Sequence, residues 1–317
     1  MPRVAILDDY QDVARTMADW TSLPPGFEVT VFNDHVSEPA ALARRLADFE
    51  VVCIMRERTP FPRAVFAQLP KLGLLVTTGM RNLSVDMAAA AAHGVTVCGT
   101  RGTTPPTPEL AMGLILALAR HIPFEHQAMR QGRWQTTIGR SLHGATLGLL
   151  GVGRLGSYVA KLGKAFGMEA IGWSQNLTAE KAAEQGVRRV DRDELFASAD
   201  FLSIHLVLGD RSRGLVGAAD FARMKPTAYL VNTSRGPIVQ QDALIAALTE
   251  RRIAGAGLDV YDTEPLPADH PLRRLDNVVL TPHLGYVTDD TYRLFYADTV
   301  ECVAAWAKGA PVRVITD

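Results

Sequence analysis

The sequence has little of several features that would each point to a specialised class of protein. Its 317 residues carry 33 basic and 34 acidic side chains, a net charge of −1. No overall charge therefore draws the chain to nucleic acid or to an anionic membrane. Only three cysteines occur, Cys53, Cys98 and Cys302, and none of them has the short spacing of a disulfide framework or a zinc site. These absences predict a soluble, cytoplasmic protein without a metal, whose partner is a small molecule.

Long hydrophobic runs are missing as well. The longest apolar stretch, residues 110–119, falls well short of the roughly 20 residues that a membrane helix needs. The apolar run at residues 4–7 is too short for the core of a signal peptide. The chain also has no tandem repeat and no low-complexity tract. We therefore expect no contact with a membrane, and a globular chain of about two domains.

Short apolar strands alternate with helical patterns along nearly the whole chain. This alternation predicts βαβ units, so the expected fold class is α/β with two doubly wound parallel sheets. The expected strands are 4–7, 28–32, 51–55, 72–77, 95–98, 146–150, 169–173, 201–205, 228–232, 254–258 and 278–281. The expected helices are 39–48, 85–93, 157–166, 191–197, 241–251 and 289–308.

A segment rich in proline and glycine, residues 99–108, predicts a boundary between the two regions, because neither a helix nor a central strand runs through such a sequence. A long helical pattern follows from about 108 to about 128, with Pro123 as the expected kink or break. The last helix, 289–308, can pack on either sheet. The residues alone therefore leave open whether the first domain is continuous in sequence.

The most specific local signal is a strand that runs directly into a G-x-G-x-x-G pattern, with a helical pattern after it. In this setting Gly151 permits a tight turn, Gly153 lets the backbone approach a pyrophosphate, and Gly156 allows close packing of helix on strand. The N-terminus of the helix attracts the phosphates. The pattern predicts a dinucleotide site, and the same turn contributes two further candidate contacts, Arg154 and Leu155.

The end of the next strand leaves the choice of cofactor open. Sites that select NAD usually carry an acidic residue there, which binds the ribose hydroxyls. This chain has Ser174, followed by Gln175 and Asn176. No carboxylate repels the 2′-phosphate of NADP and no adjacent arginine attracts it, so NAD and NADP both remain candidates.

Ionisable residues follow three successive expected strands. These residues are Arg235, Asp259 and His283, and Glu264 lies in the loop just after Asp259. Ligands of open parallel sheets bind outside the carboxyl ends of the strands, so we expect these side chains to share one crevice. An arginine can bind a carboxylate through two hydrogen bonds, and an imidazolium can donate a proton to a carbonyl oxygen. Near a dinucleotide, this combination suits hydride transfer to a 2-oxo acid.

Three blocks of sequence carry a resemblance to the D-isomer-specific 2-hydroxyacid dehydrogenase family that extends over nearly the whole chain. They are residues 231–236 (VNTSRG), 257–265 (GLDVYDTEP) and 281–285 (TPHLG), in that order after the glycine motif. The resemblance implies an oxidoreductase in which Arg235 binds the substrate carboxylate and His283 is the acid/base paired with Glu264. It also implies that Asp259 and the backbone around Thr233 hold the nicotinamide carboxamide.

The resemblance further implies a flavodoxin-like substrate domain formed by residues 1–100 and 285–317, and a Rossmann cofactor domain formed by 101–284. Backbone N–H groups of the loop at Thr78 and Gly79 would receive the substrate carboxylate, and Arg56 would contact the distal end of the substrate. Thr107, near the start of the long helix, would lie near the cofactor. A homodimer that uses this helix in its interface is implied in the same way.

We therefore expect hydride transfer between NAD or NADP and a small D-2-hydroxy acid or 2-oxo acid, such as glyoxylate or hydroxypyruvate. Two alternatives stay open. The first is a dehydrogenase of another small anion, phosphite or formate, although formate dehydrogenases usually lack an acidic partner such as Glu264. The second is a dinucleotide-sensing corepressor, a group that resembles this fold and keeps the same Arg, Glu and His. Such proteins usually carry additional tails, which we expect this chain to lack.

Overall fold

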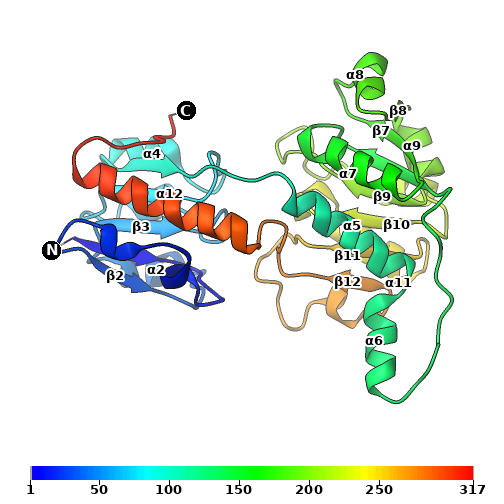
Figure 1. The fold of residues 1–317 in the computed structure, drawn as a ribbon, viewed down its shortest axis with the longest axis horizontal. Helices are drawn as coiled ribbons and strands as arrows, with labels where there is room; N and C mark the ends of the chain where they lie inside the picture. Colours follow the sequence, from blue (N-terminus) through cyan, green and yellow to red (C-terminus); the bar gives the residue numbers. More distant parts are fainter. Residues whose placement is uncertain (1, 317) are drawn as a thin grey trace. The chain divides into compact units, whose positions relative to one another are not determined.

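The computed structural model describes residues 2–316 and divides the chain into two compact units (Figure 1). One unit comprises Met1–Thr103 and Thr288–Asp317, and the other comprises Thr104–Val287. Each unit contains one parallel sheet with helices around it. The predicted fold class, α/β with two doubly wound parallel sheets, is confirmed.

The first unit is built on a five-stranded sheet with the order β2-β1-β3-β4-β5, the order of flavodoxin-like folds. Its strands are β1 (Arg3–Ile6), β2 (Glu28–Val31), β3 (Val51–Ile54), β4 (Leu74–Thr77) and β5 (Thr96–Gly99). Its helices are α1 (Ala14–Met17), η1 (Trp20–Ser22), α2 (Pro39–Leu46), α3 (Arg63–Phe66), α4 (Met87–Ala92) and α12 (Asp289–Ala307). Although α12 comes last in the sequence, it packs on β4 and β5 and lies along this sheet (Figure 1).

The second unit is built on a seven-stranded sheet with the order β12-β11-β10-β9-β6-β7-β8. This order contains the doubly wound arrangement of dinucleotide-binding folds, in which the chain direction across the sheet reverses between β6 and β9. The strands are β6 (Thr146–Leu150), β7 (Glu169–Trp173), β8 (Arg188–Arg189), β9 (Phe201–Ile204), β10 (Tyr229–Asn232), β11 (Gly255–Leu258) and β12 (Val278–Leu280).

Helices cover both faces of this second sheet. One face is buried under α5 (Pro106–Ala119) and α7 (Arg154–Ala165), and the other is buried under α9 (Arg192–Ser198), α10 (Ala218–Arg223) and α11 (Gln241–Thr249). Both faces of the inner strands are therefore apolar, which explains their nearly continuous hydrophobic sequences. The remaining elements are α6 (Ile122–Arg130), α8 (Ala179–Glu184), η2 (Gly236–Ile238) and η3 (Pro271–Arg274).

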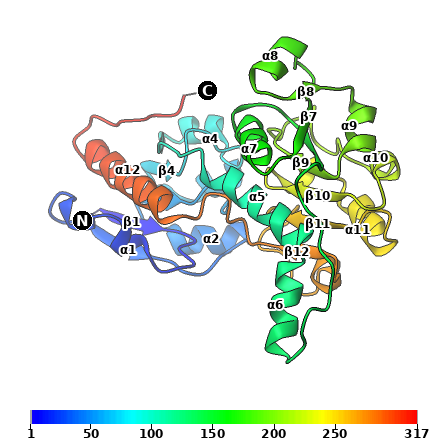
Figure 2. The ribbon, with the colours of Figure 1, turned by 45° about the vertical axis from the view of Figure 1, so that its right-hand side comes forward.

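The helical pattern expected from about 108 to about 128 is divided into two helices, α5 and α6, but the division lies at His121 and not at Pro123, the expected kink or break. The chain turns at His121, which has a left-handed backbone with φ of 50°. Pro123 lies at the second position of α6, where its missing N–H needs no partner, so it starts a helix instead of breaking one. Figures 1 and 2 both show α6 extending away from the sheet of its unit.

Among the described residues, no helix combines the length and the apolar character needed to cross a membrane.

Candidate active site

The glycine-rich turn after β6 has the geometry of a phosphate cradle. Gly151 has φ of +106°, and a Cβ on it would lie 2.6 Å from the carbonyl oxygen of His205. A Cβ on Gly156 would collide with the carbonyl oxygen of Gly151, whereas Gly153 has open space beside it. The helix α7 begins at Arg154, three residues earlier than predicted, and no side chain caps its N-terminus. Its first N–H groups are therefore suited to receive the phosphates of a dinucleotide.

Three further residues near this turn were predicted to contact the cofactor, and two of them make hydrogen bonds in the structure. Ser174, at the end of β7, accepts a hydrogen bond on Oγ from Val152 N (2.9 Å) and so connects the end of the strand to the turn. Arg154 donates from Nη1 to Thr104 Oγ1 (2.7 Å). Leu155 is half-buried. The position at which sites that select NAD carry an acidic residue thus has a neutral hydroxyl, and this hydroxyl already accepts a hydrogen bond within the turn.

The turn after β10 is organised by the side chain of Asn232. Its Oδ1 accepts from Ser234 N and its Nδ2 donates to Arg235 O, both at 3.0 Å. Arg235 has an extended backbone, and its Nη1 donates to Ser234 O (2.7 Å). Thr233 is buried, and its Oγ1 has no hydrogen-bond partner within residues 2–316. A buried hydroxyl without a partner is costly, so this atom fits a bound polar group such as a carboxamide.

Asp259, at the end of β11, organises the loop that carries His283. Its carboxylate accepts hydrogen bonds from Thr281 Oγ1 (2.6 Å), Leu284 N (2.7 Å) and Gly285 N (2.9 Å). The side chain is fully buried, and burial raises its pKa above the ordinary value even though these donors favour the charged form. Thr107 Oγ1 donates to Gly285 O (2.7 Å) from the first turn of α5. The loop is therefore fixed from two sides.

His283 and Glu264 form a hydrogen-bonded pair. Nδ1 of His283 lies 2.6 Å from Oε2 of Glu264, and Oε1 of Glu264 accepts from Tyr261 N (2.9 Å). Because a carboxylate only accepts hydrogen bonds, Nδ1 donates and Nε2 is left to exchange a proton with a ligand. His283 has a left-handed backbone with φ of 56°. The two side chains are 15% and 27% exposed, so the pair is sheltered but accessible.

Close backbone packing joins the turn of Arg235 to the loop of Glu264. A Cβ on Gly236 would collide with the backbone of Tyr261, so only glycine allows this approach. The Tyr261 hydroxyl lies within hydrogen-bond distance of two carbonyl oxygens, Leu258 O (3.0 Å) and Thr281 O (2.9 Å), and shares its one proton between them. The loops after β10, β11 and β12 thus form one connected framework at the carboxyl edge of the sheet, where doubly wound folds bind their ligands.

His205 lies beside the glycine-rich turn and is a neutral residue of its wall. Burial lowers its pKa to about 4. Its Nε2 lies 2.9 Å from Ser203 Oγ, within hydrogen-bond distance. We therefore assign no acid or base role to it.

In the first unit, the predicted substrate contacts come together at the ends of β3 and β4. Arg56 has φ of 53°, donates from its backbone N to Thr78 Oγ1 (2.9 Å) and from Nη1 to Thr78 O (3.2 Å). Gly79 has φ of +86°, and a Cβ there would collide with the guanidinium of Arg56. The two amides predicted to receive a carboxylate already have acceptors, because Thr78 N donates to Ile54 O (3.2 Å) and Gly79 N donates to Thr100 Oγ1 (2.8 Å).

Sequence reasoning missed several residues that hold these side chains. Thr281 and Tyr261 lie inside the family blocks, but their hydrogen bonds to Asp259 and Glu264 have no sequence signal of their own. Thr100 lies in the segment rich in proline and glycine that we interpreted only as a boundary. Its presence directly after an apolar strand is the one signal that would have pointed to it.

Comparisons with known proteins agree with this geometry. Residues 112–285 match the family model of the D-isomer specific 2-hydroxyacid dehydrogenase NAD-binding domain. The chain is 34% identical over 263 residues to the D-3-phosphoglycerate dehydrogenase of Synechocystis sp., covering 82% of this chain and 47% of that protein. It is 34% identical over 292 residues to the glyoxylate reductase of Korarchaeum cryptofilum, covering 89% and 87%.

A solved structure is similar over its full length. It is the phosphoglycerate oxidoreductase of Vibrio cholerae, with a TM-score of 0.93 and 40% sequence identity, and the match covers 98% of this chain and 100% of that one. The chain spans about half the length of the Synechocystis protein. The matched domain is an NAD-binding domain, which agrees with the cradle around Gly151, so the unit Thr104–Val287 binds a nicotinamide cofactor. The chain therefore belongs to the D-isomer-specific 2-hydroxyacid dehydrogenase family.

Proposed function

We propose that the protein transfers a hydride between NAD or NADP and C2 of a small 2-oxo or D-2-hydroxy acid. The observation that carries this proposal is the His283–Glu264 pair, with Nδ1 and Oε2 at 2.6 Å, in the same framework of loops as Arg235. A proton carrier held by a carboxylate and a guanidinium that can bind a second carboxylate are the two groups that reduction of a 2-oxo acid needs. The bound nicotinamide supplies or accepts the hydride.

Each residue has one task in this proposal. His283 donates its Nε2 proton to the carbonyl oxygen during reduction and accepts it back during oxidation. Glu264 keeps the ring oriented through Nδ1 and stabilises its positive charge. Arg235 binds the substrate carboxylate and stabilises the negative charge that develops on the carbonyl oxygen. Asp259 holds the loop of His283 and, with Thr233, provides polar contacts for the carboxamide of the cofactor.

We assign the two units to two tasks. The unit Thr104–Val287 is the cofactor domain, and the unit formed by Met1–Thr103 and Thr288–Asp317 is the substrate domain. Arg56 contacts the substrate from the second of these. The amides of Thr78 and Gly79, which were predicted to receive the substrate carboxylate, already donate to other acceptors, so this loop instead holds the Arg56 guanidinium. The small size of the substrate is supported by the similarity to a glyoxylate reductase along 87% of its length, so glyoxylate and hydroxypyruvate are the first candidates.

A spectrophotometric screen tests this proposal. Glyoxylate, hydroxypyruvate, pyruvate and bulkier 2-oxo acids are each offered with NADH and with NADPH, and dinucleotide oxidation is followed. We expect turnover of at least one small 2-oxo acid, and the ratio of the two cofactors reports the preference that Ser174 leaves open. Tight dinucleotide binding without turnover of any acid would contradict the proposal and favour a sensing role.

Glu264→Gln is expected to lower kcat for reduction about 10-fold, the effect of one charge-assisted hydrogen bond. The amide can still accept from Tyr261 N but carries no charge, so the protonated ring of His283 loses its stabilising partner. Because reduction uses the protonated ring, loss of this partner slows proton donation to the substrate. The measurement is kcat for reduction in wild type and variant under the same conditions. An unchanged kcat would show that Glu264 does not act on His283.

We also propose that the protein is a homodimer that uses α6 and the segment after it. Five large apolar side chains there are exposed: Ile122 (52%), Phe124 (40%), Met129 (51%), Trp134 (73%) and Ile138 (94%). Burying such surface against a second copy would be favourable. Sedimentation equilibrium is expected to give twice the chain mass of 34.4 kDa. The double variant Ile138→Asp, Trp134→Asp is expected to shift the measured mass toward that of the monomer. A wild-type monomer at micromolar concentration would contradict this.

A further inference from the structure

A hydroxyl buried beneath the loop at Thr78 and Gly79 connects it to the end of β5. Thr100 is fully buried. Its Oγ1 accepts a hydrogen bond from Gly79 N (2.8 Å) and donates one to Arg101 O (2.9 Å), so the hydroxyl acts both as an acceptor and as a donor. The loop also lies tightly on Gly99, where a Cβ would come within 2.6 Å of Gly79 O. The loop therefore rests on Gly99 and Thr100.

The peptide group between Thr78 and Gly79 is held at both ends. Its carbonyl oxygen accepts from Arg56 Nη1 (3.2 Å), and its N–H donates to Thr100 Oγ1 (2.8 Å). Gly79 is in the left-handed region, where a glycine is free to change conformation at little cost. Two hydrogen bonds on opposite ends of one peptide plane remove that freedom. The same two bonds fix where the Arg56 guanidinium lies.

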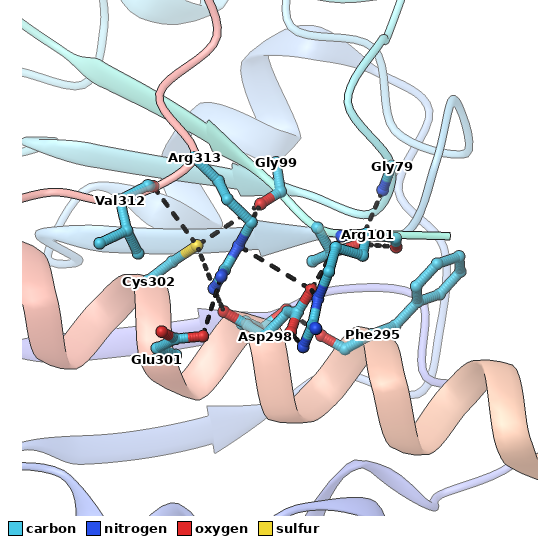
Figure 3. Close-up of polar contacts among 11 residues, drawn as sticks. Gly79, Gly99, Arg101, Phe295, Asp298, Glu301, Cys302, Val312 and Arg313 are labelled. Carbon is cyan, nitrogen blue, oxygen red and sulfur yellow. Dashed lines mark hydrogen bonds and ion pairs between the residues drawn. The ribbon is translucent and has the colours of Figure 1, made fainter. Parts of the chain in front are cut away.

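Thr100 is itself fixed through its neighbour Arg101 by the last helix. Asp298 of α12 accepts from the Arg101 backbone N (2.8 Å) and from its Nη2 (2.7 Å), as Figure 3 shows. Arg313 donates from Nη2 to Asp298 O (2.8 Å) and from Nε to Gly99 O (3.2 Å). Burial opposes ionisation of Asp298, but the hydrogen bonds from Arg101 and the charge of Arg313 outweigh it, so its pKa lies below the ordinary value.

We propose that Thr100 is a positioning residue for substrate binding, which acts by fixing the Thr78–Gly79 peptide group and, through it, the guanidinium of Arg56. The inference rests on the proposed function, in which Arg56 contacts the 2-oxo acid. A guanidinium that is already held in place binds the substrate without the cost of ordering it first. Loss of the hydroxyl therefore weakens substrate binding and leaves proton transfer at His283 and dinucleotide binding unaffected.

The test compares Thr100→Val, which removes the hydroxyl at constant shape, with Thr100→Ser, which keeps it. Thr299→Val is the matched control, because Thr299 is also buried but its hydroxyl donates to Phe295 O of its own helix. We expect Thr100→Val to raise KM for glyoxylate or hydroxypyruvate about 10-fold, the effect of one hydrogen bond, with kcat changed less than about 3-fold and the Kd of NADH unchanged. Thr100→Ser and Thr299→Val are expected to keep the wild-type KM.

Amide hydrogen exchange of residues 77–82 is measured on the same variants and does not depend on activity. Thr100→Val should speed exchange in this loop, and Thr299→Val should not. If the wild type turns over no 2-oxo acid, the proposed function fails while the exchange result still decides the role of Thr100. Equal exchange and equal KM in Thr100→Val and Thr299→Val would overturn the inference, and so would a parallel loss of NADH binding. Thr100→Ala replaces Thr100→Val if the valine variant does not fold.

Discussion

Replacing His283 by alanine is expected to lower kcat for reduction of a 2-oxo acid about 10²–10⁴-fold, the usual contribution of a positioned general acid. Nδ1 of this ring is hydrogen-bonded to Glu264, so Nε2 is the nitrogen that can exchange a proton with the substrate. The dinucleotide does not depend on this proton, and its Kd should stay at the wild-type value. Steady-state kinetics and a fluorescence titration with NADH measure the two quantities.

His283→Asn is the control for backbone strain. The φ of 56° at His283 is unfavourable for alanine, whereas asparagine tolerates the left-handed region better than most residues. Asparagine cannot carry a proton at the Nε2 position. If both variants lose the same factor in kcat, the loss belongs to proton transfer. Near-normal turnover in either variant would refute the role assigned to His283.

Arg235→Gln is expected to lower kcat/KM for glyoxylate about 10²–10³-fold. A guanidinium that binds a carboxylate through two charge-assisted hydrogen bonds contributes about 3–4 kcal/mol, and a neutral amide cannot replace it. The turn itself should persist, because Asn232 holds it through backbone atoms of Ser234 and Arg235. Kinetics with glyoxylate over a wide concentration range give the measurement.

Arg235→Lys separates charge from geometry. Lysine keeps the positive charge but has a single ammonium in place of the planar fork, so it should recover about 10-fold of the loss and no more. The Kd of NADH serves as the internal control. An equal loss of NADH binding and substrate turnover would mean that Arg235 holds the turn after β10 together and does not bind the substrate.

The strands were predictable from the sequence for a physical reason. Strands buried on both faces must be apolar throughout, and runs such as 51–54 and 74–77 stand out against the polar turns beside them. The edge strand β8 is only Arg188–Arg189, exposed and charged, so no pattern marks it. The short helices α1 and α3 likewise have too few residues to show a period.

The start of α7 was predicted too late because local preference and tertiary packing disagree there. Glycine lowers helix stability, so Gly156 reads as part of a loop. In the structure it is inside the first turn of the helix, where any side chain would collide with Gly151 O. Packing of the helix on the turn decides the boundary. Sequence preference alone cannot supply that information.

The chemistry-bearing residues were recognisable because they lie in short blocks at strand ends, but the bonds between them were not. That Asp259 accepts from Leu284 N and Gly285 N depends on the register of β11 and β12, which no local pattern encodes. The hydrogen bond from Gly79 N to Thr100 Oγ1 depends equally on the pairing of β4 with β5. Such contacts between distant residues become visible only when the fold is known.

The most direct test of the proposed reaction is to follow the hydride itself. The protein is incubated with glyoxylate or hydroxypyruvate, whichever turns over faster, and with NADH or NADPH that carries deuterium at both C4 positions. The product is analysed by mass spectrometry and chiral chromatography. We expect one deuterium at C2 of the 2-hydroxy acid, with the D configuration when C2 is a stereocentre, and formation of the labelled product about 10²–10⁴-fold more slowly with His283→Asn. A product without deuterium, or no product despite bound dinucleotide, would contradict the account.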